Sequence, residues 1–261
     1  MARIYPLFSS SKGNATFIGT PDSGILIDAG VTAKRLKDGM ERCGLSMNAI
    51  RGVFITHSHS DHIRGLKMLT KQLAVPVFAQ PLTLRELTDS DSVSAGTVLH
   101  ELDGQPLCFF DMQITPFDTP HDTVQSCGFR VALPDGQSCA VCTDLGTVTK
   151  QVEHTLLGCS LVLLEANYDE TMLRTGSYPP TLKARIASEI GHLSNTASGA
   201  FAKKLVASGT KRLILGHLSE ANNTPQRAAA AVEAALAGAK RGQDYLLDVA
   251  KPETEGRMIA F

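Results

Sequence analysis

The sequence predicts an α/β fold of two packed, mixed β-sheets with helices on their outer sides. Short apolar runs separated by turn residues fill residues 2–28 and 105–142, which is the pattern of strand-rich blocks. The last third of the chain alternates segments of helical and strand-like spacing, so that helices accompany strands in each half. No low-complexity tract or linker interrupts the 261 residues, and 43% of them are hydrophobic, so we expect residues 1–261 to form a single domain.

The first half is expected to alternate strands with helices around one polar loop. Residues 2–28 are predicted to form two or three strands of an edge hairpin, with residues 9–14 as a polar, glycine-containing loop between them. That loop is either an ordinary hairpin turn or an anion-binding loop. Thr32 is a predicted N-cap for a helix that ends near Gly44, and the apolar run 53–55 is a predicted strand followed by a further helix.

The second half is expected to begin with antiparallel strands and to end with alternating helices and strands. The continuous apolar run 160–164, which ends at Glu165, is predicted to be a strand buried on both faces. The other predicted strands are 105–117, 127–133, 138–142, 213–215, 245–249 and 257–259. The predicted helices are 180–190, a segment after 195 that runs to 206, and 225–238.

Composition and charge exclude several classes of protein. The net charge is −1, so the chain is no bulk polycation of the kind that coats nucleic acid, and any contact with a polyanion must be local. No apolar run approaches the length of a membrane span, and no signal segment is evident, so we expect a cytoplasmic protein without a membrane partner. The six cysteines lie scattered in apolar segments of a large chain, which favours reduced core thiols over a disulfide framework.

One short stretch carries most of the chemistry. The segment Thr56-His57-Ser58-His59-Ser60-Asp61-His62 places three imidazoles and a carboxylate within six residues, directly after a predicted strand. Such a density of ligand side chains at a strand end indicates a metal site, and the mixture of imidazole and carboxylate suits zinc, manganese or iron. His57 and His59 would bind one ion, and Asp61 and His62 another. The alternative is a polar surface loop that happens to be rich in histidine.

The pattern His-x-His-x-Asp-His resembles the signature of the metallo-β-lactamase superfamily. The resemblance requires an isolated histidine, an isolated aspartate and a last histidine downstream, each at the end of an apolar strand, and His121, Asp144 and His217 meet that requirement. It implies an αββα sandwich that binds two divalent ions, which would be Zn or Mn, with Fe also possible. By the same resemblance, Asp144 bridges the two ions and Asp28 steadies the ligand loop. The implied ligands are His57, His59, Asp61, His62, His121, Asp144 and His217.

Three further stretches resemble the nuclease branch of this superfamily. They are Leu164-Glu165-Ala166-Asn167-Tyr168-Asp169, Gly191-His192-Leu193-Ser194-Asn195 and Gly216-His217-Leu218-Ser219. In tRNase Z-like enzymes a glutamate after the corresponding strand pairs with a histidine that protonates the leaving oxygen. By this resemblance Glu165 and His192 are catalytic, together with Asp61. The alternatives are a strand-end surface acid for Glu165 and a helix-capping surface residue for His192.

The whole chain is most similar to the YycJ/WalJ-type group, which is associated with 5′ exonuclease activity on DNA. This implies a phosphodiesterase that acts through hydroxide activated by two metal ions, with a nucleic acid as partner, DNA rather than RNA. We expect neighbouring phosphates to contact polar side chains of the loops around the site. These are Ser10, Lys12, Asn14, Arg185, Ser194 and Ser219.

Two other functions remain open at the level of sequence. A glyoxalase II-like thioesterase or lactonase would use the same metal pair, and His192 would then be idle. A metal-binding regulatory module without catalysis is disfavoured because no ligand is missing from the pattern. The sequence predicts neither the native metal nor the oligomeric state.

Overall fold

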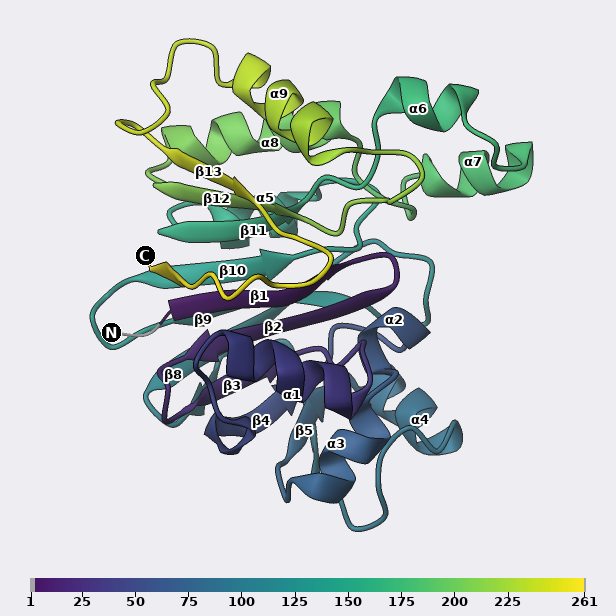
Figure 1. The fold of residues 1–261 in the computed structure, drawn as a ribbon, viewed down its shortest axis with the longest axis vertical. Helices are drawn as coiled ribbons and strands as arrows, with labels where there is room; N and C mark the ends of the chain where they lie inside the picture. Colours follow the sequence, from purple (N-terminus) through teal and green to yellow (C-terminus); the bar gives the residue numbers. More distant parts are fainter. Residues whose placement is uncertain (1–2, 261) are drawn as a thin grey trace. The chain divides into compact units, whose positions relative to one another are not determined.

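The structure, a computed structural model, describes residues 3–260. Their strands form two seven-stranded sheets, ordered β14-β1-β2-β3-β4-β5-β6 and β13-β12-β11-β10-β9-β8-β7 (Figure 1). The chain divides into two compact units with one sheet each. Unit 1 contains the chain up to Gln105 together with Thr123–Ser126 and Ala250–Ala260, and unit 2 contains Pro106–Asp122 and Cys127–Val249. The prediction of a single domain stays a prediction.

The sheet of unit 1 is mixed. Its first strands pair antiparallel, whereas β3 to β6 run parallel to one another. The strands are β1 (Arg3–Ser10), β2 (Gly13–Gly19), β3 (Gly24–Ile27), β4 (Ile50–Phe54), β5 (Val77–Ala79), β6 (Leu99–Glu101) and β14 (Ile259–Ala260). The helices are α1 (Ala33–Arg42), α2 (Ser60–Ile63), α3 (Leu66–Gln72) and α4 (Pro81–Asp89), with a short 3₁₀ turn at Met47–Ala49.

The core of unit 1 lies between its sheet and the helices beside it. The predicted cap of α1 is present, since the Thr32 side chain accepts a hydrogen bond from the Arg35 N–H. Leu36 and Met40 of α1 are fully buried and join one apolar cluster with Leu26 and Val53 of the sheet. Burial of this stripe, and not helix propensity alone, holds α1 on the sheet.

Three expectations for unit 1 are corrected by the structure. Strand β1 is not at the edge, because β14 from the end of the chain pairs with it. Residues 9–14 form no long loop: Ser9 pairs with Asn14, and Ser10 pairs with Gly13, inside the ladder. The helix after the histidine-rich stretch is broken into α2 and α3 near Gly65, where a Cβ would lie 2.0 Å from the backbone oxygen of Val31.

Unit 2 contains a second mixed sheet. Its strands are β7 (Leu107–Phe109), β8 (Met112–Asp118), β9 (Cys127–Ala132), β10 (Ser138–Cys142), β11 (Leu161–Glu165), β12 (Arg212–Gly216) and β13 (Leu246–Val249). Its helices are α5 (Lys150–Leu156), α6 (Glu170–Thr175), α7 (Pro180–Ile186), α8 (Asn195–Ala207) and α9 (Pro225–Ala235). Figure 1 shows α8 and α9 beside β12 and β13, and the two helices pack against each other.

The direction of the strands in unit 2 decides where its polar residues meet. Strands β10, β11, β12 and β13 are parallel, and β9 is antiparallel to both β10 and β8. Strand β8 therefore runs in the same direction as β10. The carboxyl ends of β8, β10, β11 and β12 consequently lie along one edge of the sheet.

Some elements of the described chain differ from the sequence prediction. Helices α4 and α6 were not predicted, and α7 ends at Ile186, short of the predicted residue 190. All six cysteines are free, as predicted, and four of them are buried while Cys108 is exposed. Within residues 3–260, no helix is both long and apolar enough to cross a membrane.

Candidate metal centre and active site

The predicted ligands of unit 1, and the aspartate predicted to steady their loop, lie at the carboxyl ends of two neighbouring parallel strands. Asp28 follows β3, and the stretch from Thr56 to His62 follows β4. The two strand ends are joined by a hydrogen bond of 2.9 Å from the Asp28 N–H to the Phe54 carbonyl. Parallel pairing thus brings a carboxylate and a histidine-rich loop to one edge of the sheet, as ligand loops of α/β proteins require.

The Asp28 side chain hydrogen-bonds two residues of the histidine-rich loop. Its Oδ1 accepts the Thr56 N–H at 2.9 Å, and its Oδ2 lies 2.7 Å from Nδ1 of His62. The Thr56 hydroxyl donates to Asp28 and also lies 3.0 Å from Nδ1 of His57. Both imidazoles therefore have Nδ1 turned toward protein groups, which leaves Nε2 of each as the ligand atom.

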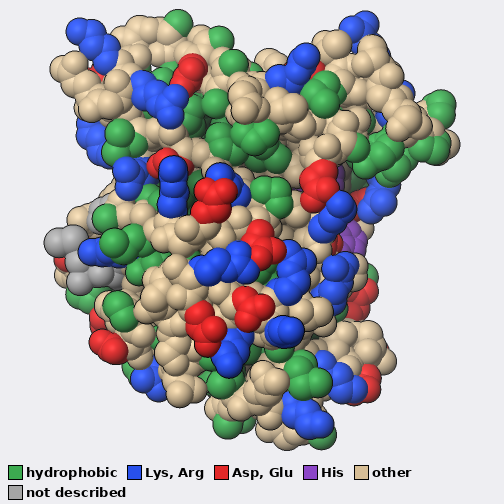
Figure 2. All heavy atoms as spheres, viewed as in Figure 1, with side chains coloured by type: hydrophobic (Ala, Val, Ile, Leu, Met, Phe, Trp, Pro, Cys, Tyr) green, Lys and Arg blue, Asp and Glu red, His purple; other side chains and the backbone are tan. Residues whose placement is uncertain are grey.

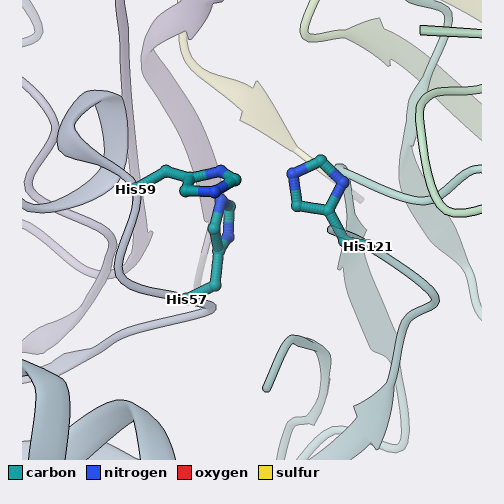
Figure 3. Close-up of side chains that lie close together, drawn as sticks. All are labelled: His57, His59 and His121. Carbon is teal, nitrogen blue, oxygen red and sulfur yellow. The ribbon is translucent and has the colours of Figure 1, made fainter. Parts of the chain in front are cut away.

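The histidines of this loop form a close group. The ring centroids of His57 and His59 are 4.7 Å apart with the planes nearly perpendicular, as Figure 3 shows, and those of His57 and His62 are 4.1 Å apart. Ser58, between the first two, donates a hydrogen bond to Glu86 on α4. The unpredicted helix α4 therefore fixes the ligand loop from outside.

Asn14 also belongs to this group rather than to an open loop. Its Nδ2 lies 3.3 Å from Oδ2 of Asp61 and 3.1 Å from Nε2 of His62. The tight approach depends on Gly30, where a Cβ would stand 1.6 Å from the backbone oxygen of Asp61.

The predicted site residues of unit 2 gather at the shared edge of its sheet. His121 lies in the loop after β8, Asp144 after β10, Glu165 at the end of β11 and His217 directly after β12. His121, also labelled in Figure 3, has its Nδ1 3.1 Å from the Gly191 carbonyl. His192 stands next to that glycine, so the Gly-His stretch is held beside a predicted ligand.

Glu165 is the centre of this group. It is fully buried, and its Oε1 lies 2.9 Å from Nδ1 of His192 and 2.8 Å from Nδ1 of His217. Three backbone N–H groups complete the shell of the carboxylate, those of Asp144, Leu145 and Leu193. With its oxygens engaged in this way, Glu165 fixes the orientation of the His192 and His217 rings through their Nδ1 atoms.

Glu165 and His192 each favour the charged form of the other. Burial by itself would raise the pKa of Glu165, but the charge and hydrogen bond of His192 outweigh it, so the pKa is lowered. Burial likewise disfavours protonation of His192, yet the charge of Glu165 and its hydrogen bond raise the pKa of His192 above its ordinary value. Because Glu165 is fully buried and its Oε1 lies 2.9 Å from Nδ1 of His192, the two are not independent surface residues.

Three of the predicted site residues occupy the left-handed region of backbone conformation. Asp28, Asp144 and His217 have φ of 61°, 58° and 54°. In the described chain the other non-glycine residues with positive φ are Asp91 and Phe110. Left-handed geometry costs roughly 1–2 kcal/mol for an L residue, and it persists where surrounding contacts enforce it, as at functional sites.

The donor set of the two units fits divalent transition metals. Four of the predicted ligand histidines have Nδ1 within hydrogen-bonding distance of a protein oxygen, which is the usual arrangement of a metal-binding imidazole; they are His57, His62, His121 and His217. In unit 2, Asp144 and His217 offer ligand atoms within 4.8 Å of each other. Neutral imidazole and carboxylate together suit Zn, Mn or Fe.

The residues predicted to contact phosphate have local structural partners. Ser194 is the N-cap of α8, and Glu170 hydrogen-bonds the Ser194 and Thr196 side chains at the same helix end. Arg185 forms an ion pair with Asp122, and the hydroxyl of buried Ser219 accepts the Asn222 N–H.

The N-terminal loop residues have local roles as well. The Ser10 hydroxyl accepts the Lys12 N–H, and Asn14 packs among Asp61 and His62 as described above. Contact of any of these six residues with substrate stays a prediction.

The comparisons with known proteins identify the class. The model of the β-lactamase superfamily domain matches residues 24–218, so the chain belongs to the β-lactamase superfamily. It is similar to the exodeoxyribonuclease YycJ of Bacillus anthracis, with 30% identity over 88% of this chain and 87% of the relative. It is 31% identical to the exodeoxyribonuclease WalJ of Streptococcus pneumoniae over 95% of this chain and 96% of the relative.

A solved structure supports the same fold. The metallo-β-lactamase fold protein YhfI from Bacillus subtilis matches with a TM-score of 0.72 over 97% of this chain and 98% of that chain, at 15% identity. The predicted fold class, two mixed sheets flanked by helices, and the predicted family resemblance are both confirmed. The chain is a metal-dependent hydrolase of this superfamily.

The contacts of Asp28 generate a stability prediction. Replacement Asp28→Ala leaves the Thr56 N–H and hydroxyl and Nδ1 of His62 without their acceptor in a buried site, so we expect a loss of about 2–4 kcal/mol in the free energy of unfolding. Urea unfolding in the presence of a chelator measures it without a contribution from metal. Asp22→Ala, in an exposed turn, is the control and should change stability by less than about 0.5 kcal/mol. Equal midpoints for the two variants would contradict the role of Asp28.

Proposed function

We propose that this protein is a metal-dependent phosphodiesterase that degrades nucleic acid, and that it is a 5′ exonuclease on DNA. We further propose that His57, His59 and His121 hold one divalent ion, that Asp61, His62 and His217 hold the other, and that Asp144 bridges them. The observation that carries the proposal is the position of His192, whose Nδ1 is held by Glu165 while Asp144 lies 3.8 Å away at the same sheet edge. The names of the similar proteins YycJ and WalJ support DNA as substrate.

The chemistry of a phosphodiester explains why such a histidine matters. Divalent ions at the site supply Lewis acidity, which lowers the pKa of water and neutralises charge on a phosphate. The remaining difficulty is the leaving alkoxide, which needs a proton from a positioned acid. His192 supplies it from Nε2, because Nδ1 is engaged with Glu165, and its side chain is 20% exposed and thus accessible to substrate.

The overall distribution of charge also suits a substrate that is recognised by few charges. On the face that Figure 2 shows, Lys and Arg side chains are interspersed with Asp and Glu side chains over each unit. The net charge of −1 agrees with contacts to phosphates near the scissile bond rather than along a long duplex.

Digestion of end-labelled nucleic acids tests the proposal directly. Single- and double-stranded DNA and RNA, each with a 5′-phosphate or a 5′-hydroxyl, are incubated with metal-loaded protein. We expect stepwise loss of nucleotides from the 5′ end of DNA. Turnover of a thioester or lactone with no cleavage of bis(p-nitrophenyl) phosphate or DNA would replace this function by that of a glyoxalase II-like enzyme.

The metal content of the purified protein tests the proposed dinuclear site. Protein purified gently in buffer with added Zn²⁺ or Mn²⁺ should contain about two ions per chain by elemental analysis, because the ligand set divides between two ions. The bound ions should also raise the melting temperature, since a ligand that binds only the folded state stabilises it. A content below one ion per chain would refute the dinuclear assignment.

Asp61 should affect rate more than folding. Its side chain is 20% exposed and its Oδ2 lies 3.5 Å from Nε2 of His62, so Asp61 would help to hold an ion whose Lewis acidity would activate water. Asp61→Asn should lose most hydrolysis of bis(p-nitrophenyl) phosphate while it keeps a cooperative thermal transition. Turnover close to that of the wild type would show that Asp61 has no catalytic role.

His192 should distinguish natural from activated substrates. Replacement His192→Ala should slow cleavage of a natural DNA linkage by about 10² to 10⁴, the usual contribution of a general acid. The loss should be much smaller with a p-nitrophenyl leaving group, whose anion hardly needs a proton. Metal content should not change, because His192 is not among the proposed ligands.

Glu165→Gln provides the companion variant. It removes the negative charge that orients His192 but keeps a side-chain acceptor, so it should show the same dependence on leaving group to a lesser degree. Because Glu165 also holds Nδ1 of His217, the comparison is made at saturating metal. Equal losses of His192→Ala on both substrates would indicate a role in binding or structure, and loss of metal would make His192 a ligand. Either result rejects the proton-donor role.

A further inference from the structure

His217 adopts a left-handed backbone conformation, which is uncommon for a residue other than glycine. It follows β12 with φ of 54°, in the left-handed region, and its residue is 1% exposed. Its Nδ1 is oriented by Glu165, but a carboxylate on one ring atom does not fix the backbone from which the ring extends. Another group must hold the main chain of His217 in place.

Asn167 contacts that main chain directly. Its Nδ2 donates to the His217 carbonyl at 2.9 Å and lies 3.4 Å from the ring nitrogen Nδ1. Asn167 is 2% exposed and stands two residues after Glu165, so one short segment carries both groups that hold His217. The Asn167 carbonyl accepts the Ser219 N–H at 2.8 Å, which ties down the chain just beyond the histidine.

Two more buried asparagines extend this contact. Asn223 donates from Nδ2 to the carbonyls of Ala166 at 2.8 Å and of Asn167 at 3.2 Å. The amides of Asn223 and Asn195 also face each other and exchange hydrogen bonds of 2.9 and 2.8 Å. Asn195 is the first residue of α8 and lies three positions after His192.

The amide chain therefore joins three segments, each of which carries one site residue. They are the segment after β11 with Glu165, the segment after β12 with His217, and the start of α8 with His192. Asparagine suits every position because its amide both donates and accepts without adding charge. A carboxylate at position 167 could not donate to the His217 carbonyl, and it would add a negative charge near Glu165.

We propose that Asn167, held in place by Asn223 and Asn195, is a positioning residue that sets the direction of the His217 imidazole and hence the affinity of the metal site. This rests on the proposed function, in which His217 is a metal ligand. Groups that orient a metal-binding histidine typically change metal affinity by about 10- to 100-fold when they are replaced. Asn167 acts through His217 and has no contact with substrate in this role.

The test measures metal affinity separately from stability and turnover. Metal-free wild type, Asn167→Asp and Asn167→Ala are titrated with Zn²⁺ in competition with a chromophoric chelator, and their urea unfolding is recorded with excess chelator. We expect the affinity for one of the two ions, the one that His217 would hold, to fall by about 10- to 100-fold in both Asn167 variants. Hydrolysis of bis(p-nitrophenyl) phosphate at saturating Zn²⁺ should recover most of its rate.

Asn222→Ala is the matched control. Asn222 is a buried asparagine of the loop after β12, next to Asn223, and is 1% exposed. Among the described residues its side chain hydrogen-bonds Ser219 and not His217, Glu165 or His192. This variant should be destabilised in urea and yet bind Zn²⁺ as the wild type does. If the Asn167 variants also bind Zn²⁺ with wild-type affinity, Asn167 is merely structural and the inference is overturned.

Asn195→Ala covers the case in which the Asn167 variants do not fold. It removes the partner of Asn223 at the far end of the amide chain, so it should weaken Zn²⁺ binding less than an Asn167 replacement but more than Asn222→Ala. Unchanged affinity in a folded Asn195→Ala protein would overturn the inference in that case.

The outcomes also separate this inference from the proposed function. Wild type that binds and cleaves DNA in a Zn²⁺-dependent manner, with no change of affinity in the variants, rejects the positioning role alone. Wild type that binds Zn²⁺ and loses affinity in the Asn167 variants, but cleaves no phosphodiester, rejects the nuclease alone.

Discussion

A buried carboxylate must be surrounded by hydrogen-bond donors, and this requirement organises the polar cluster of each unit. Glu165 has no exposed surface, so its two oxygens need the imidazoles of His192 and His217 and three backbone N–H groups. Those donors come from separate segments of unit 2, and they converge only because the acid lies at the end of a central strand. In unit 1, Asp28 does the same for Thr56 and His62.

The same two acids explain why the histidines are suited to metal. Each holds an imidazole through Nδ1, and the ring then presents Nε2 outward from the strand edge. The left-handed backbones of Asp28, Asp144 and His217 turn the chain sharply where a strand ends, so that a side chain projects from the edge instead of continuing along the sheet. Strain at these positions is offset by the dense hydrogen bonding around them.

Several polar residues that were predicted to contact phosphate also have structural partners that spacing does not indicate. Ser194 looks like a phosphate-binding serine at a helix start, yet its hydroxyl caps α8, and the carboxylate of Glu170 also hydrogen-bonds at that helix end. Arg185 forms an ion pair with Asp122, the neighbour of a predicted ligand. Such pairings between residues far apart along the chain are not visible in a sequence motif, whereas candidate metal ligands are.

The sequence by itself determined the class of fold and supplied candidate metal ligands. These follow from local signals: apolar runs of strand length, a cap at Thr32, and ligand side chains immediately after strands. The pairing of Glu165 with His192 was predicted from the resemblance to tRNase Z-like enzymes, and the structure contains that contact. The short helices α4 and α6 escaped prediction, although Asp169, which caps α6, was a usable signal.

Only the tertiary structure decided which distant groups meet. It placed β14 beside β1, brought Glu86 to Ser58, and assembled Asn167, Asn195 and Asn223 into one buried chain. The physical reason is that a hydrogen bond between residues far apart along the chain depends on the path of the backbone through the whole sheet. Spacing and composition describe only what a segment does with its nearest neighbours.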